Sequence, residues 1–388
     1  MAPCFAIAVG HNTCFKSRPM QRFTSRSLAL LSALATLFSV HSAVAQSTST
    51  SPGGVPVTVS KSMDFPQGIW VLTHENDWFL YSDRDYTGGL RLAYTTPNAS
   101  DWSHLPVAGW LGSAFNHVSL IDSSAAQDAI GAYANLNIYT PDILTLDPPN
   151  AKDHPYAGWT SVGYDLIRQT MDRRAIFEMN FGLVGPTSGA EQLQKSFHSL
   201  IGSTQPAGWA YQIKDEPVVQ LTYRQDWRPA FLTNLNSSGS GPINYDVIGH
   251  VLGTAGNGFD YAATGLIARV GYHLPADFGV ARPRLGEIDS APFQATGASA
   301  PETNWAYLCL GTEARAVARD ITVDGNTFTT NSYSQVNHAP FVAEYYGGAA
   351  VEYGWFRGSF LIVYESHTFN TQSQAGQWRG ILSLGVAF

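Results

Sequence analysis

Two short segments of the sequence carry side chains that could act together in a hydrolytic reaction. Ala190–Ile201 contains no Pro or Gly and is flanked by Gly189 and Gly202, so it is predicted to be a helix. Gln194 and His198 are four residues apart, which places both side chains on one face of that helix. A His in this position can take a proton from water, as ester hydrolysis requires of a general base.

The second segment is Asn76-Asp77, which offers an amide oxygen and a carboxylate side by side. Such hard oxygen ligands suit calcium, and a cation held by Asp77 with Asn76 beside it could polarise an ester carbonyl. The chain contains no G-x-S-x-G sequence, which argues against the serine-esterase arrangement of soluble hydrolases. Together the two segments could supply a His base and a ligand for a metal ion.

Each of these residues also has a simpler interpretation. A single His on a helix is more often a surface or packing residue than a base. Asn and Asp are common at strand ends and in turns, because both tolerate turn backbone. The same two interpretations, binding site or ordinary loop, apply to Asp153-His154 and to Asp83-Arg84.

The composition excludes several classes of protein. Only 13% of the 388 residues are charged, against about 25% in a soluble domain, and 12% are aromatic. No internal apolar run reaches the ~20 residues that a membrane helix needs, and 36 Gly with 21 Pro are too many for a helical bundle. The net charge of −8 disfavours nucleic acid as a partner, since phosphate binding requires a basic patch. An all-β chain remains.

Residues 1–45 have the features of an export signal. Arg22 and Arg26 precede the apolar run Leu28–Val40, which is followed by an Ala-Val-Ala cleavage site. The run is too short to serve as a membrane anchor. A complete signal peptide also begins at Met20, which we expect to be the true start of the chain.

Residues 46–67 are rich in Ser, Thr, Pro and Gly and are predicted to form a flexible leader. The folded part then spans 68–388, where Cys309 has no partner, which excludes a disulfide framework and a cysteine metal site. Short segments that alternate between apolar and polar residues recur through this part. They predict about twelve strands, an even number as bacterial barrels require: Ile69–Asn76, Thr87–Thr95, Gly131–Ile138, Ala157–Gln169, Arg174–Val184, Pro217–Trp227, Ile243–Gly253, Asp260–Tyr272, Asn304–Asp320, His338–Gly348, Tyr353–Tyr364 and Gln377–Phe388.

The last segment has the pattern of a strand in a membrane-spanning barrel. Trp378, Leu382 and Leu384 face one way, Arg379 and Ser383 face the other, and the chain ends in Phe. This pattern is typical of the final strand of an outer-membrane barrel. A soluble sandwich has the same period, but the export signal and the lack of helical spans favour the barrel. We therefore predict an all-β fold, a transmembrane antiparallel β-barrel with a short helix in an extracellular loop.

The strand order assigns the connections to the two sides of the membrane. If the first strand runs outward, loops 77–86, 139–156 and 185–216 are extracellular. The unusual polar residues of the N-terminal half fall in these three loops, so the sequence predicts a chemical site at the outer rim. Two connections, 97–130 and 273–303, are longer than periplasmic turns usually are, and short helices or missed strands are the interpretations left open.

The polar segments of the three outer loops have a recognisable order. They are ENDWF and SDRDYTGGLR, then IYTPD and PYAGW, then GPTSGAEQLQKSFH and GWAYQIKDEP. This combination resembles the LpxR-type lipid A 3′-O-deacylases, and the resemblance runs from about Gly68 to Phe388. It implies a barrel in the bacterial outer membrane, with its site between the barrel wall and a helix of an outer loop. It also implies that Ca²⁺ serves removal of the 3′-linked acyloxyacyl group from lipid A.

The resemblance implies roles for particular residues. It gives five catalytic side chains: His198, Asn76, Asp77, Thr87 and Gln194. It also makes Asp77 a metal ligand. At the position six residues after the His, where family members can carry a Glu, this chain has Thr204. Asp215 or Glu216 could supply the missing carboxylate, and we take Glu216 as the second expected metal ligand.

The expected function is that of a calcium-dependent carboxylic ester hydrolase in the outer membrane. Its partners would be lipid A, or lipopolysaccharide, and outer-membrane lipid, and we expect a monomer. Two alternatives stay open: a passive pore or structural barrel, and a barrel hydrolase or acyltransferase that acts on phospholipid. Loss of activity with a chelator, combined with a mass change on lipid A only, would separate the first function from both alternatives.

Overall fold

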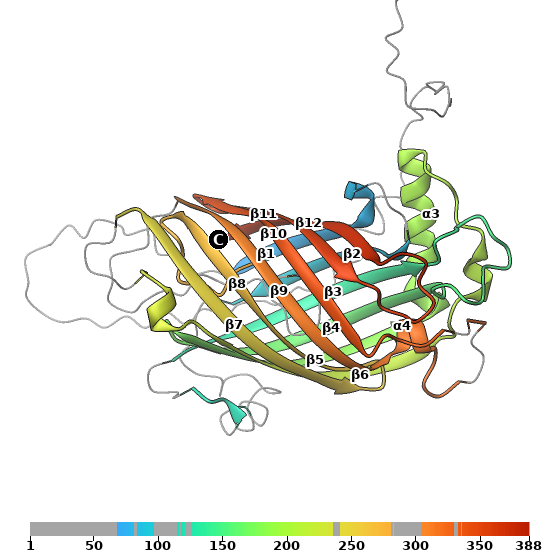
Figure 1. Cartoon of the computed structure of the whole chain (residues 1–388), viewed down its shortest axis with the longest axis horizontal. Coiled ribbons are helices and arrows are strands. Elements are labelled where there is room, and N and C mark those ends of the chain that lie inside the picture. The colour runs from blue at the N-terminus through green and yellow to red at the C-terminus, as the bar shows by residue number, and fades with distance from the viewer. Residues whose placement is uncertain are drawn as a thin grey trace, which may run out of the picture. The chain divides into compact units, whose positions relative to one another are not determined.

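In the computed structural model of the protein, twelve strands form a closed barrel (Figure 1). The structure describes residues 68–80, 84–96, 115, 118–121, 126–235, 241–280, 282, 304–329, 333–334 and 336–387. The predicted signal peptide and leader lie outside the described residues.

Each strand pairs in antiparallel fashion with its neighbours in sequence, and β12 pairs with β1 to close the barrel. The predicted fold, an antiparallel barrel with a short helix in one loop, is confirmed. The strands are β1 (Ile69–Asn76), β2 (Asp85–Thr95), β3 (Gln127–Thr140), β4 (Ala157–Gln169), β5 (Arg173–Val184), β6 (Glu216–Trp227), β7 (Ile243–Gly256), β8 (Phe259–Tyr272), β9 (Asn304–Asp320), β10 (Phe341–Tyr353), β11 (Phe356–Ser366) and β12 (Gly376–Ala387).

The two faces of the wall differ in polarity as the sequence predicts. On β9 the outward-facing side chains Leu308 and Leu310 are 63% and 72% exposed, whereas Glu313 is buried in the lumen. On β12 Leu384 faces outward, and Ser383 faces inward, where its hydroxyl contacts Thr73. An apolar outer face and a polar inner face are what a barrel in lipid requires.

One hairpin is displaced from its predicted place. The predicted strands end at Gly348 and resume at Tyr353, but Gly347 and Gly348 lie inside β10, and the turn to β11 falls at Gly354. Gly354 has a φ of 60°, a conformation that glycine adopts at no steric cost. A Cβ at Gly348 would meet the carbonyl oxygen of Phe360 at 2.0 Å, so this glycine serves close packing within the sheet rather than a turn.

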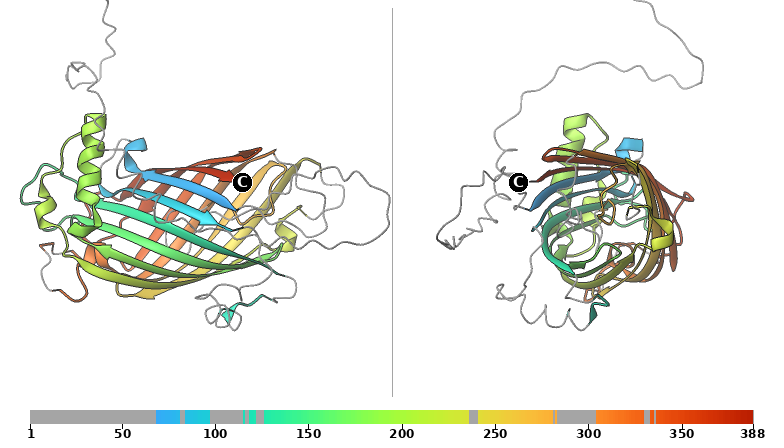
Figure 2. Two further views of the ribbon diagram at one scale, coloured as in Figure 1. Left: turned by 180° about the vertical axis from the view of Figure 1, so that it is seen from behind. Right: turned by 90° about the vertical axis from the view of Figure 1, so that its left-hand side faces the viewer.

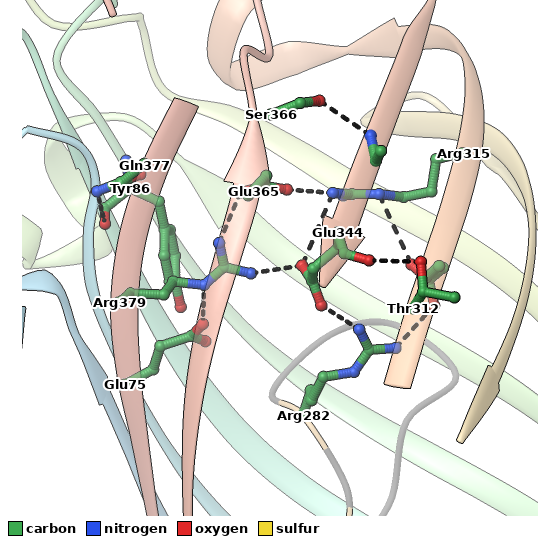
Figure 3. A network of polar contacts seen from close by, with 12 residues as sticks. Glu75, Tyr86, Arg282, Thr312, Arg315, Glu344, Glu365, Ser366, Gln377 and Arg379 are labelled. Atoms are coloured by element: carbon green, nitrogen blue, oxygen red, sulfur yellow. Dashed lines mark hydrogen bonds and ion pairs between the residues drawn. The ribbon is translucent and has the colours of Figure 1, made fainter. Parts of the chain in front are cut away.

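The outer half of the lumen contains a network of buried ion pairs (Figure 3). Arg379 lies at its centre and contacts carboxylates on three strands: Glu75 on β1, Glu344 on β10 and Glu365 on β11. Arg282 pairs with Glu344 from the side of the long β8–β9 connection. These charges are buried and paired, which is the condition under which charge is tolerated away from water.

The start of the β8–β9 connection folds into the lumen. Phe278 is buried there, and the guanidinium groups of Arg174 and Arg228 lie 5.0 and 4.8 Å from the centre of its ring. Asp277 contacts Arg269, and Arg269 also binds Asp246 at 2.6 Å. Part of this unusually long connection is therefore a segment that fills the barrel.

The longest helix of the described residues, α3 (Ala190–Ile201), lies at the rim that carries the loops predicted to be extracellular, and its bounds match the prediction. It follows the short 3₁₀ helix η4 (Pro186–Ser188) and stands at one end of the barrel, across the direction of the strands (Figure 2). No helix in the described part of the chain is long and apolar enough to cross a membrane.

Candidate functional site

A cavity of about 230 Å³ lies between the outer surface of the barrel wall and helix α3. The five side chains expected to be catalytic all line it: Asn76, Asp77, Thr87, Gln194 and His198. They come from the end of β1, the 3₁₀ helix η2 (Asp77–Leu80), the start of β2, and α3. The fold thus brings together residues that are more than 100 positions apart in the sequence.

The helix can approach the wall closely because small residues meet at its N-terminal end. A Cβ at Gly158 of β4 would lie 2.4 Å from the Cβ of Ala190 and 2.1 Å from the hydroxyl of Ser188. A side chain at position 158 would therefore push the helix away from the strand. At its other end the helix stops at Gly202, which has a φ of 72° and donates its N–H to the carbonyl of His198.

The turn after the helix orients the ring of His198. Nδ1 of His198 lies 2.5 Å from the backbone carbonyl oxygen of Thr204. A carbonyl oxygen can only accept, so Nδ1 carries the hydrogen and Nε2 of the neutral ring carries the lone pair that can accept a proton. The backbone carbonyl of Thr204 thus holds the ring, and this contact does not depend on the side chain at position 204.

Gln194 lies one helical turn before His198, and only 2% of it is exposed. Its side-chain oxygen accepts a hydrogen bond from the indole N–H of Trp209 at 2.8 Å. Its amide nitrogen has no hydrogen-bond partner among the described residues. Trp209, which follows the helix in the same outer loop, is absent from the site residues predicted from the sequence.

Asn76 and Asp77 are buried at the opposite side of the cavity. Asp77 Oδ2 accepts hydrogen bonds from the backbone N–H of Arg84 at 2.8 Å and from the amide of Gln377 at 3.3 Å. Asn76 Oδ1 accepts from the backbone N–H of Trp78 at 2.7 Å. These bonds fix both side chains, as active-site groups require.

Thr87 completes the polar part of the lining from β2. Its hydroxyl lies 2.6 Å from the hydroxyl of Thr140 on β3. Its neighbour Gly88 leaves room for the site, because a Cβ there would lie 2.9 Å from Nδ2 of Asn76.

The chemistry of this donor set fits calcium. Asn76, Asp77 and Thr87 present amide, carboxylate and hydroxyl oxygens, the ligand types that Ca²⁺ prefers. The described residues include no group of three or more His, Cys, Asp or Glu side chains that could hold a metal ion. A calcium ion held here would thus have a single carboxylate from the side chains that line the cavity, and neutral oxygens would supply its other ligands.

Most of the remaining lining is apolar. From the wall come Leu90, Leu136 and Ile138, and from the helix come Leu193 and Phe197, one turn apart. None of these five was predicted as a site residue. The sequence does contain a pattern that indicates them, because Leu193 and Phe197 are four residues apart on the helix and the strand residues alternate between the two faces of the wall. The cavity therefore joins a few fixed polar groups to a surface suited to hydrocarbon.

The structure does not bring Glu216 to this cavity. Its carboxylate accepts hydrogen bonds from the backbone N–H groups of Thr327 and Phe328, both at 3.1 Å, and so holds the β9–β10 connection. Asp215, the other carboxylate considered, accepts from the backbone and hydroxyl of Thr187. Neither residue lines the cavity around Asp77, so neither belongs to the candidate site.

Asp153 and His154 also lie apart from the cavity beneath α3. The ring of His154 stacks on Tyr139 and lines a separate cavity of about 110 Å³ inside the barrel. Burial lowers the pKa of His154 to about 4 and raises the pKa of Asp153 above its usual range. Arg84 meets the site through its backbone, as described above, whereas Asp83 lies outside the described residues.

The chain is similar in sequence to one known protein family and in fold to a solved structure of that name. The profile of a family described as "Outer membrane protein LpxR" matches residues 30–388. The structure of LpxR from Salmonella typhimurium superposes with a TM-score of 0.64 at 20% identity, covering 82% of this chain and 100% of that one. The β-domain of the Bordetella autotransporter BrkA gives a TM-score of 0.39 at 9% identity, covering 83% and 100%.

No curated protein sequence matches the chain. The family profile covers far more than half of the chain and the whole barrel. The protein is therefore an outer-membrane barrel that belongs to the LpxR family.

Proposed function

We propose that the protein is a hydrolase of the outer membrane that removes the 3′-linked acyloxyacyl group from lipid A. One observation carries the proposal: five polar side chains from four separate elements line one cavity, whose remaining surface is largely apolar. An ester between a sugar and a fatty acid needs both kinds of surface, polar groups for the ester and apolar side chains for the acyl chain.

In this proposal His198 is the general base. Its Nε2 takes a proton from a water molecule while the water oxygen attacks the ester carbonyl carbon. The bond between that carbon and the sugar oxygen then breaks, and the proton on His198 passes to the departing sugar oxygen. The carbonyl of Thr204 keeps the ring in the required tautomer throughout, since it accepts the hydrogen on Nδ1.

Gln194, Asn76 and Thr87 would hold the ester in place. The amide of Gln194 faces the reacting groups from the helix, while Asn76 and Thr87 face them from the wall. Asp77, with Asn76 and Thr87, would hold Ca²⁺, which when bound polarises an ester carbonyl. Leu90, Leu136 and Phe197 would exclude water from the acyl chain.

The alternatives account for less of the structure. A passive pore requires an open lumen, but ion pairs and the buried side chain of Phe278 lie inside the described barrel. A hydrolase or acyltransferase acting on phospholipid would use the same cavity. The choice between lipid A and phospholipid therefore depends on the substrate and is decided by experiment.

The test uses purified, refolded protein and mass spectrometry of the lipid. We expect lipid A to lose the mass of its 3′ acyloxyacyl group, phospholipid vesicles to remain unchanged, and a calcium chelator to stop the reaction reversibly. Asp77→Asn should need more added calcium for the same rate, because it removes the negative charge of the site while keeping its size. Unchanged lipid A, or cleavage of phospholipid instead, would contradict the proposal.

A further inference from the structure

Trp209 makes a contact that determines which end of the Gln194 amide faces the cavity. A Gln side chain carries an oxygen that accepts and an NH₂ group that donates, and the two ends have nearly the same shape. The indole N–H of Trp209 can only donate. Because it lies 2.8 Å from Oε1 of Gln194, the oxygen must face Trp209.

The NH₂ group of Gln194 is consequently turned away from Trp209. It is buried and has no hydrogen-bond partner among the described residues, although Gln194 itself lines the cavity. A buried donor without an acceptor costs free energy in the protein alone, so it is an unusual feature unless a ligand supplies the acceptor. The nearby lining is mostly apolar, which strengthens any hydrogen bond formed there.

The surroundings of Trp209 hold its ring rigidly. Its ring centre lies 4.8 Å from that of Tyr156, and the hydroxyl of Tyr156 donates to the carbonyl of Leu144. A Cβ at Gly208 would lie 2.7 Å from the ring of Tyr156, so the chain passes directly over it. Two outer loops, 141–156 and 203–215, are tied together at this point by a further bond, from Ala207 N to the carbonyl of Leu144.

We infer that Trp209 is a positioning residue for catalysis. It fixes the amide of Gln194 so that the NH₂ group faces the cavity and donates to the carbonyl oxygen of the bound ester, which gains negative charge during attack by water. The inference rests on the proposed ester hydrolysis for the identity of its acceptor. It assigns Gln194 the role of a donor to that oxygen and gives Trp209 a role that acts only through Gln194.

The activity test is a double-mutant cycle on lipid A. Trp209→Phe keeps a ring but removes the N–H, so the amide can turn over; we expect kcat to fall about tenfold with KM little changed, the equivalent of one hydrogen bond. Gln194→Met should lower kcat by about 10²–10³, as loss of an oxyanion donor does. In the Gln194→Met background, Trp209→Phe should have no further effect.

Two variants separate positioning from packing. Gln194→Glu still accepts from Trp209 but has no NH₂ group, so it should be as inactive as Gln194→Met. Trp159→Phe is the matched control: Trp159 is also buried, but its indole N–H has no partner among the described residues, and it lines the lumen cavity instead. It should keep near wild-type turnover, and a loss equal to that of Trp209→Phe would show that packing alone is responsible.

A second measurement does not require activity. In ¹H–¹⁵N spectra of the protein in detergent, the indole signal that Trp209→Phe removes should exchange slowly in wild type. The exchange should accelerate in Gln194→Met and remain slow in Gln194→Glu. If the wild type does not cleave lipid A, the proposed function fails while this signal still tests the contact. The inference is overturned if the exchange rate of this indole N–H is the same in Gln194→Met as in wild type. It is also overturned if Trp209→Phe lowers kcat by the same factor in the wild-type and Gln194→Met backgrounds.

Discussion

The inside and the outside of the barrel wall use polar residues in opposite ways. In the lumen, charged groups meet one another: Arg379 contacts three carboxylates and Arg269 contacts two. In the cavity beneath α3, a few polar side chains are surrounded by apolar ones, and the amide nitrogen of Gln194 has no partner in the described structure. Pairing in the lumen serves stability, whereas polar groups aimed into an apolar cavity serve a ligand. Substitutions in the lumen should therefore lower the free energy of unfolding, whereas substitutions in the cavity should lower the activity.

The largest effect is expected from His198→Ala, which should separate activity from stability. A general base contributes about 10²–10⁴ in rate, so deacylation should fall at least ~10²-fold. The variant should still migrate as a folded barrel and should still bind lipid A. His367→Ala, an exposed His of the β11–β12 loop, is the control. Wild-type turnover in His198→Ala would show that the base has been assigned wrongly.

The opposite result is expected from Arg269→Met in the lumen. Without the guanidinium, the buried carboxylates of Asp246 and Asp277 lose the positive charge of Arg269. This loss should lower the free energy of unfolding by about 3–5 kcal/mol. Turnover of the molecules that remain folded should be unchanged. Urea unfolding in lipid vesicles measures the loss, and the exposed Arg173→Met is the control, because exposed pairs contribute only about 0–1 kcal/mol. Loss of activity without loss of stability would contradict this division between lumen and cavity.

The outward face of β9, which is apart from both regions, gives a smaller effect. Leu310→Arg places a charge on a side chain that is 72% exposed near the middle of β9. An Arg at the bilayer midplane costs about 2–4 kcal/mol, so the folding yield into vesicles should fall. Gln374→Arg, in the exposed β11–β12 loop, should fold normally. Equal yields would mean that the outward face of β9 does not contact lipid.

The effect that depends on pH concerns His154, at the outer end of the lumen. Its pKa is about 4 in the folded loop, and an unfolded His has a pKa of about 6.5. Between these values the unfolded chain binds the additional proton, so folding stability should fall as the pH drops from 6.5 towards 4, by at most ~1.4 kcal/mol per pH unit. His154→Gln should lack this component. The free energy of unfolding is measured with urea for wild type and His154→Gln. A difference between the two proteins that is the same at every pH would refute the prediction.

Much of the fold could be predicted because barrel strands carry a period of two. Ile69–Asn76, Ala157–Gln169 and Asn304–Asp320 begin and end where the alternation does. The displaced β10–β11 turn shows the limit of this pattern. Glycine serves both turns and close strand packing, and the sequence around Gly347-Gly348 does not distinguish them.

The site was predicted less completely, for a physical reason. His198 and Gln194 could be assigned to one helix face, since that relation is local. Trp209 lies in the short 3₁₀ helix η5 (Gly208–Tyr211) beyond α3, and its ring packs against Tyr156 of another loop, so its contact with Gln194 is not local in the sequence. Glu216 was expected at the metal as a substitute for the carboxylate that is missing at Thr204, but β6 begins at Glu216 and its carboxylate binds a different connection.

A cavity on the outer surface of the wall has a kinetic consequence. A lipid in the outer leaflet would enter by lateral diffusion between Leu90 and Phe197, without crossing the lumen, and the released fatty acid would leave by the same route. Encounter between enzyme and substrate would then take place in two dimensions. Under the proposed function, the rate would depend on the mole fraction of lipid A in the surface, and dilution with inert detergent at constant bulk concentration would slow the reaction.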